Sequence, residues 1–218
     1  MGRSDALATI WPLRGLRLRT AQLRLQVMTE ADLATLCALL PDDVGQDPAA
    51  TRYAALDDRA NRSAVLVQSY WRAMGTWSPL EWKLPFVVRL RGEVVGVQWL
   101  EGSAFPTRRT VDSASWLVPA VRGRGVGRQM RQAVLALAFG PLGARAAVSS
   151  AVLGNAASLG VSHALGYRDV GTAPLGDGPE VLQLLRLERS DWLARRAGEG
   201  VAVEGAEVCL PLFGLGSA

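Results

Sequence analysis

The chain has 218 residues, of which 49% are hydrophobic and 20% charged, which is typical of one folded domain with a sizeable core. Its formal net charge is +4, but the arginines are scattered, so a nucleic-acid-binding function is not expected. No apolar run is long enough to span a bilayer, and the arginine-containing N-terminus does not resemble a secretory signal. We therefore expect a cytoplasmic protein that does not associate with a membrane.

The histidine and cysteine content argues against several kinds of site. His163 is the single histidine, so a Ser-His-Asp triad or a histidine-based metal site would depend wholly on it. Cys37 and Cys209 show no motif spacing and are expected to be buried or incidental thiols. The sequence predicts neither a metal site nor a disulfide.

The first half of the chain alternates strand and helix patterns. Apolar and polar residues alternate over 16–27, which predicts one half-buried strand. A helix is expected to begin after Thr29 and to end before Pro41. An acidic loop over 41–60 and a second helix over 62–77 follow.

The second half begins with a predicted hairpin and ends in an unclear tail. Strands are expected over 84–90 and 93–102, with Gly92 in the turn between them. A further strand over 109–118 leads into a glycine-rich turn and then a helix that ends at Gly140. The remaining predicted elements are a strand over 144–153, a helix over 155–166, and strands over 167–173 and 181–188. The order predicts an α+β fold, a mixed sheet with helices on both faces.

The glycine-rich turn, "VRGRGVGRQM", is the strongest functional signal. It lacks the Lys-Ser/Thr end of an ATP-binding P-loop, and Arg128 stands where a dinucleotide-binding loop needs its third glycine. Glycines would let the backbone approach a pyrophosphate, and the first amides of the following helix would face that anion. A plain strand-to-helix connection is the alternative.

The turn resembles the R/Q-x-x-G-x-G/A motif of the GNAT superfamily of acyl-CoA N-acyltransferases, with Arg122, Gly125 and Gly127 at the motif positions. "NAASLGVSHALGYRDVG" is similar to the superfamily's next motif, in which Asn155 would bind pantetheine and Ser158 or Ser162 would lie near the thioester sulfur. The alternative for Asn155 is a helix N-cap, and both roles can coexist.

The resemblance extends over about residues 14–190. "LRTAQLRLQVMTEADL" resembles the opening of the RimJ/RimL-like branch, and later segments are similar to an actinobacterial group, some of whose members carry succinyl groups. The resemblance implies a GNAT fold, whose mostly antiparallel sheet is splayed in the middle. It also implies acetyl-CoA, or alternatively succinyl-CoA, as the donor. The expected cofactor-binding residues are Leu117, Val118, Arg122, Gly123, Arg124, Gly125, Val126, Gly127, Arg128 and Asn155.

Catalysis of acyl transfer needs a proton acceptor for the attacking amine and a donor to the developing oxyanion. Asp112 is the candidate base, on a face shared with Trp116; a structural turn, or an ion pair with a neighbouring arginine, is the alternative. By resemblance the oxyanion donor is the backbone N–H of Trp116 or Leu117. Many relatives place a tyrosine acid where this chain has Ser162, so the general acid is left open, with water as one source of the proton.

The acceptor amine is expected near an acidic loop with aromatic neighbours. We take a cationic amine as the hypothesis and a solvated acidic loop as the alternative. The candidate substrate-binding residues are Asp47, Tyr53, Trp71 and Trp82, with Asp42, Asp43, Asp57, Asp58 and Trp77 nearby.

The sequence thus predicts an N-acyltransferase acting on a small-molecule amine or a protein N-terminus by direct attack in a ternary complex. The alternative is a non-catalytic acyl-CoA-binding or regulatory module of the same fold. We expect an acyltransferase domain over 1–190 and an extension over 191–218 that forms an edge strand or the arm of a homodimer.

Overall fold

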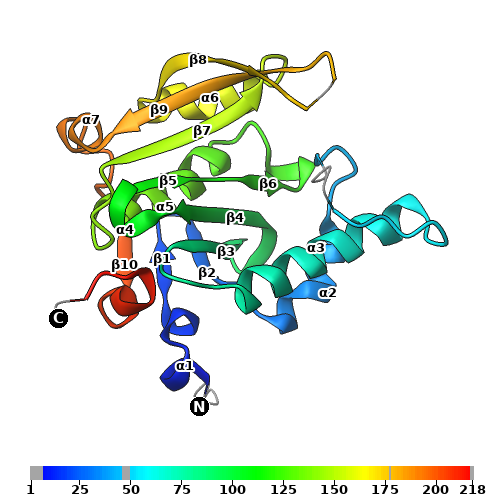
Figure 1. Ribbon diagram of the computed structural model, residues 1–218, viewed down its shortest axis with the longest axis horizontal. Helices are drawn as coiled ribbons and strands as arrows, with labels where there is room; N and C mark the ends of the chain where they lie inside the picture. The colour runs from blue at the N-terminus through cyan, green and yellow to red at the C-terminus, as the bar shows by residue number, and fades with distance from the viewer. Residues whose placement is uncertain (1–6, 46–49, 177, 217–218) are drawn as a thin grey trace.

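The computed structural model describes residues 7–45, 50–176 and 178–216. Within these residues, ten strands form one open sheet (Figure 1). The strands are β1 Arg17–Arg19, β2 Leu23–Val27, β3 Glu81–Leu90, β4 Glu93–Ser103, β5 Thr110–Asp112, β6 Ser115–Leu117, β7 Ala146–Val152, β8 Arg168–Pro174, β9 Val181–Glu188 and β10 Ala202–Glu204. The α-helices are α1 Leu7–Ile10, α2 Glu30–Leu39, α3 Asp58–Gly75, α4 Phe105–Arg108, α5 Val126–Phe139, α6 Ala156–Leu165 and α7 Arg189–Ala194, with 3-10 turns η1 Pro12–Gly15, η2 Pro119–Val121 and η3 Glu207–Phe213.

The sheet has the order β10-β1-β2-β3-β4-β5-β7-β9-β8, and β6 pairs with β4 beside β5. Every pairing is antiparallel except that of β5 with β7. Because β7 pairs with β5 but not with β6, the sheet opens into a gap between β6 and β7. The predicted α+β class and the splayed, mostly antiparallel sheet are confirmed.

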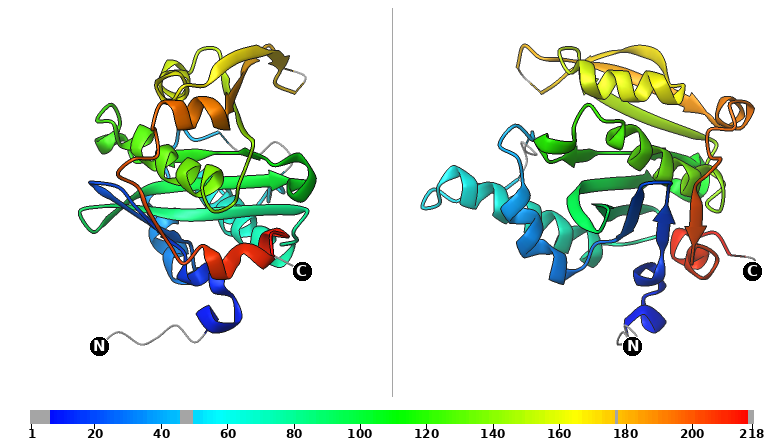
Figure 2. Two further views of the ribbon diagram at one scale, coloured as in Figure 1. Left: turned by 90° about the vertical axis from the view of Figure 1, so that its left-hand side faces the viewer. Right: turned by 180° about the vertical axis from the view of Figure 1, so that it is seen from behind.

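Two helical layers cover opposite faces of the sheet (Figure 2). Alternation along β3 shows this: Phe86 and Val88 pack in the core that contains α5, whereas Val87 packs in the core formed with α2 and α3. Neighbouring residues of a strand point to opposite faces, so α5 lies across the sheet from α2 and α3. None of the helices in the described part of the chain is both long and apolar enough to cross a membrane.

Local signals explain most element ends. The helix predicted after Thr29 is α2, and Thr29 with Asp32 forms a capping box at its start. The second helix begins earlier than predicted, because Asp57 caps α3 by accepting from the Ala60 amide at 2.7 Å. The turn between β3 and β4 has Gly92 at φ 95°, as predicted.

Two predicted strands are each divided in the structure. The single strand expected over 16–27 is a hairpin of β1 and β2, because the Thr20 hydroxyl accepts from the amides of Gln22 and Leu23 and turns the chain. The strand expected over 109–118 is interrupted between β5 and β6. Both parts keep one register against β4, with Asp112 opposite Glu101 and Trp116 opposite Val97.

The C-terminal segment packs against the rest of the chain. β10 pairs with β1 as an edge strand, one of the two arrangements expected for this region. Beyond it, the Phe213 ring is fully buried and contacts Trp77 and Trp82 edge-on, with ring centroids 5.3 and 4.9 Å away. The tail therefore belongs to the same core as the sheet.

Candidate active site

The glycine-rich turn presents unpaired backbone amides to solvent. Gly123 and Gly125 have φ values of 71° and 78°, a left-handed conformation that side chains disfavour, and a Cβ at either would meet open space. Gly125 is the N-cap of α5 and supplies no side-chain cap, so the first amides of this long helix have no partner from the cap. Such a helix start suits the pyrophosphate of CoA.

The three arginines of this turn have different surroundings. The Arg122 Nε donates to Leu117 O at 2.9 Å, and its guanidinium binds both carboxylate oxygens of Asp43, one of them at 2.9 Å. That hydrogen bond is the main reason why the pKa of Asp43 lies below its ordinary value. Arg124 and Arg128 are exposed and have no carboxylate within 4 Å among the described residues. They, rather than Arg122, have side chains free to meet a phosphate.

The gap beside β6 exposes backbone polar groups. Two hydrogen bonds fix which side of the strand faces β4: Trp99 N donates to Ala114 O at 2.7 Å, and Val118 N donates to Val95 O at 2.9 Å. In an antiparallel ladder every second residue faces the same partner strand. The amides of Ser115 and Leu117, which alternate with these residues, therefore point away from β4 and into the gap towards β7.

This alternation distinguishes the candidate oxyanion donors. Trp116 lies opposite Val97 with its amide directed at β4, whereas the amides of Ser115 and Leu117 point into the gap. The amide of Val118 donates to Val95 O of β4, so this N–H is not available to pantetheine. Of the two expected oxyanion donors, Leu117 has the suitable orientation and Trp116 does not.

Asp112 lies where β5 ends at the gap. Its side chain is open to solvent in a cavity but is surrounded by protein, and this desolvation is the main reason why its pKa is raised to about 6. The nearby Glu101 carboxylate raises the pKa further, whereas the Ser113 amide, which donates to Asp112 at 2.6 Å, lowers it, as do Arg131 and Lys83. Among the described residues, no arginine forms an ion pair with Asp112, so that alternative is not observed.

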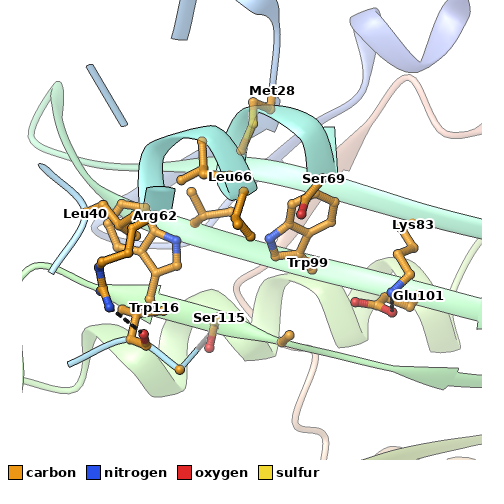
Figure 3. Close-up of a pocket in the computed structure, with 15 residues that line it drawn as sticks. Met28, Leu40, Arg62, Leu66, Ser69, Lys83, Trp99, Glu101, Ser115 and Trp116 are labelled. Carbon is orange, nitrogen blue, oxygen red and sulfur yellow. Dashed lines mark hydrogen bonds and ion pairs between the residues drawn. The ribbon is translucent and has the colours of Figure 1, made fainter. Parts of the chain in front are cut away.

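Two cavities adjoin at this point, and Glu101 and Lys83 line both. The first, of about 390 Å³, lies between α3 and the sheet (Figure 3). The second, of about 540 Å³, contains Asp112. Lys83 Nζ and Glu101 are 2.8 Å apart. Sequence reasoning missed both residues, because only the pairing of β3 with β4 brings them together.

The second motif forms a capped helix. The Asn155 side chain accepts from the Ser158 amide at 3.0 Å, which is the N-cap arrangement that the sequence allowed. Ser158 is half-buried. Ser162 is fully buried: its hydroxyl accepts from Arg131 Nη1 at 2.7 Å and donates to Ser158 O at 3.2 Å. Ser162 is therefore committed to the interior, so of the two serines expected near the thioester sulfur, Ser158 stays the candidate.

Arg131 is a buried cation that sequence reasoning missed. It lies on α5 with 5% of its surface exposed, and its other side-chain contact is Ser149 Oγ at 3.4 Å. Burial lowers the pKa of this guanidinium. The signal in the sequence was an arginine among the apolar positions of an amphipathic helix.

None of the expected acceptor residues that the structure describes lines the first cavity. Trp82 is buried, stacks on Trp77 at 5.9 Å between ring centroids, and lines the second cavity together with Asp112. Trp71 is 56% exposed, and Tyr53 is exposed and accepts a hydrogen bond from Gln68. Asp47 lies outside the described residues. Trp82 is thus the expected acceptor residue found at the cavity of Asp112, whereas Tyr53 and Trp71 line neither cavity. The aromatic walls of the first cavity are Trp99 and Trp116, which come from the strands.

Three other acidic residues of this region have structural partners. Asp57 caps α3, Asp58 pairs with Arg52 at 2.7 Å, and Asp43 binds Arg122. Within residues 7–45, 50–176 and 178–216, no group of three or more His, Cys, Asp or Glu side chains could hold a metal ion.

Comparisons with known proteins agree with this geometry. The family "Acetyltransferase (GNAT) domain" matches residues 22–168. RimJ of Mycobacterium smegmatis, solved in complex with CoA-disulfide, superposes with a TM-score of 0.62 at 17% identity, over 91% of this chain and 93% of that one. A spermidine N-acetyltransferase of Vibrio cholerae, in complex with CoA and spermine, gives 0.61 at 14% identity, over 79% and 99%. These structures share the fold, and the family match covers most of the sequence: this chain belongs to the GNAT acetyltransferase family.

Proposed function

We propose that this protein moves an acetyl group from acetyl-CoA to a primary amine by direct attack in a ternary complex. The observation that carries the proposal is the position of Asp112, a carboxylate placed both at the gap beside β6 and in a cavity open to solvent. The RimJ-like opening of the sequence and the fold shared with RimJ support membership of the RimJ/RimL-like branch. We further propose that the enzyme acts in the cytoplasm.

The binding roles follow from the backbone. The amides at the start of α5 would hold the pyrophosphate, with Arg124 and Arg128 as charged partners. The pantetheine arm would then run towards the gap, past Asn155 at the start of α6. The thioester carbonyl oxygen would accept from an N–H that points into the gap, and of Ser115 and Leu117 the amide of Ser115 is the nearer along the strand to Asp112.

The chemistry needs one proton acceptor and one proton source. As the amine attacks the thioester carbon, a C–N bond forms, and Asp112 accepts the amine proton directly or through water. The C–S bond then breaks, and the CoA thiolate leaves and takes a proton from water. With a pKa of about 6, Asp112 is mostly ionised at neutral pH and can still act as a base.

Thiol release measures this function directly. Purified protein is incubated with acetyl-CoA and a panel of primary amines, and free CoA thiol is followed with a thiol reagent while products are identified by mass spectrometry. Amine-dependent release with an acetylated product supports the proposal. Tight CoA binding without release for any amine would instead favour the non-catalytic module. Repeating the assay with succinyl-CoA distinguishes the two donors.

A further inference from the structure

The charged groups of the first cavity lie at its two ends. Arg62 of α3 stands beside Trp116 at one end, and the Lys83–Glu101 pair lies at the other (Figure 3). Between them the wall is mainly apolar and includes Leu66 from α3. A ligand that fills this space meets charge only near its two ends.

Arg62 is a half-buried cation without a carboxylate partner. Its Nη1 donates to Val44 O at 3.2 Å and its Nη2 to Pro41 O, and both acceptors are neutral. No carboxylate of the described residues lies within 4 Å of it. A guanidinium has five N–H groups, so N–H groups remain that can bind an anion at the cavity wall.

The other end is suited to the reacting amine. Glu101 lines the cavity there, and Asp112 lies directly opposite Glu101 in the ladder between β4 and β5. Two neighbouring carboxylates attract a protonated amine, while Lys83 pairs with one of them. Lys83 offsets the charge of Glu101, so the excess negative charge at this end comes from Asp112 in the adjoining cavity, and the far end carries the positive charge of Arg62.

Two tryptophans form the middle of the wall. Trp99 and Trp116 are both half-buried, and each has surface in the cavity. Indole faces favour flat or apolar groups. The four steps along β4 from Glu101 to Val97 span about 13 Å, which is an upper limit for the length of the ligand because side chains extend into the cavity from both ends.

We propose that the acceptor is a small primary amine on a flat, apolar body with a carboxylate or similar anionic group at the end remote from the amine. The inference rests on the proposed function for the position of the amine, but the anion subsite at Arg62 rests on the cavity alone. The amine meets Glu101 and Asp112, the body lies against the tryptophans, and the anion binds Arg62.

This charge pattern disfavours polyamines. Among the described residues that line the cavity, Arg62 and Lys83 are cations and Glu101 is the only carboxylate. A polyamine would bring a second positive charge towards Arg62, and the carboxylate of Asp43, whose pKa is lowered in part by Arg62, is already bound to Arg122. The acceptor of this chain therefore differs from the spermine bound in the Vibrio cholerae relative.

The test compares three amines: 4-(aminomethyl)benzoate, benzylamine, which lacks the carboxylate, and spermidine. We expect kcat/KM to be about tenfold or more higher for the carboxylate-bearing amine than for benzylamine, and lowest for spermidine. Calorimetric binding of the same amines to the CoA-bound protein should give the same order. Because binding is measured without turnover, a protein that binds the carboxylate but transfers nothing would overturn the proposed function and support the subsite.

Variants of Arg62 test whether this side chain causes the preference for the carboxylate-bearing amine. Arg62→Gln should reduce the ratio of affinities between the two aromatic amines to near one, whereas Arg62→Lys, which keeps the charge, should preserve part of it. Arg59→Gln, on the same helix but outside the cavity, should leave the ratio at its original value. A preference for spermidine, or equal affinities for the two aromatic amines in the original protein, would overturn the proposal. A ratio that survives in a folded Arg62→Gln variant would do so as well.

Discussion

Replacing Asp112 by asparagine removes the carboxylate at the gap and keeps the size of the side chain. We expect this change to lower kcat/KM at pH 7 by about 10²–10⁴-fold, the usual contribution of a general base. CoA affinity should be retained, because Asp112 is remote from the amides of Gly123–Arg128.

The pH dependence gives the sharper test. Asp112 must be ionised to accept a proton, and its pKa is about 6. About one tenth of the enzyme is therefore active at pH 5, one half at pH 6 and nine tenths at pH 7. The rate should rise with pH through this range, on top of the separate rise caused by deprotonation of the amine.

Neighbouring charges should shift this rising limb of the pH–rate profile in known directions. Glu101 raises the pKa of Asp112, so Glu101→Gln should move the limb to lower pH. The shift should be less than about one unit, because burial is the larger cause and remains. Lys83→Met removes a positive charge that lowers the pKa, so it should move the limb to higher pH.

The assay is thiol release from acetyl-CoA between pH 5 and 8, with an amine of low pKa to separate its titration from that of the enzyme. Asp169→Asn, which changes an exposed carboxylate paired with His163, is the matched control and should leave the profile unchanged. An Asp112→Asn variant that keeps the limb near pH 6 would refute the assignment of Asp112 as the base.

Three further changes test the loop, its ion pair and the tail. Gly125→Val places a β-branched residue at φ 78° where the pyrophosphate is expected, so calorimetry should show loss of CoA binding, whereas Gly160→Ala on α6 should not affect it. Asp43→Asn releases Arg122 and removes a negative charge beside the loop. The Kd for CoA should therefore fall by up to about fivefold, which corresponds to the free energy of an exposed ion pair. Weaker CoA binding by this variant would contradict the reasoning. Phe213→Ala should cost about 3–5 kcal/mol in urea unfolding because its ring is fully buried, while Val208→Ala, 67% exposed, should cost little.

The fold was predictable because its signals are local. The capping box at Thr29, the glycine turn at Gly92 and the helix end at Gly140 each depend on a few neighbouring residues. The hairpin within 16–27 was missed because alternation continues through the turn, and only the Thr20 hydroxyl bonds mark it.

The candidate site was predictable only in part, because its cavity depends on distant pairings. The loop could be found from spacing, and Asp112 from its place before the loop. Lys83 and Glu101 come together only through the register of β3 and β4, and no local pattern indicates that pairing. The acidic loop was misleading for the same reason: Asp43 and Asp57 have partners at Arg122 and in α3, which composition alone does not reveal.

The segment from Pro41 to Gly45 links the two halves of the site. Asp43 binds Arg122 of the CoA loop, while Arg62 holds the carbonyls of Pro41 and Val44, and Val44 and Gly45 line the acceptor cavity. One side of this segment therefore meets the CoA loop and the other forms the cavity wall. Arg62 consequently has two effects, one through its charge and one through the position of the wall. The Arg62→Lys variant separates them, because it keeps the charge and loses the fixed fork that holds both carbonyls.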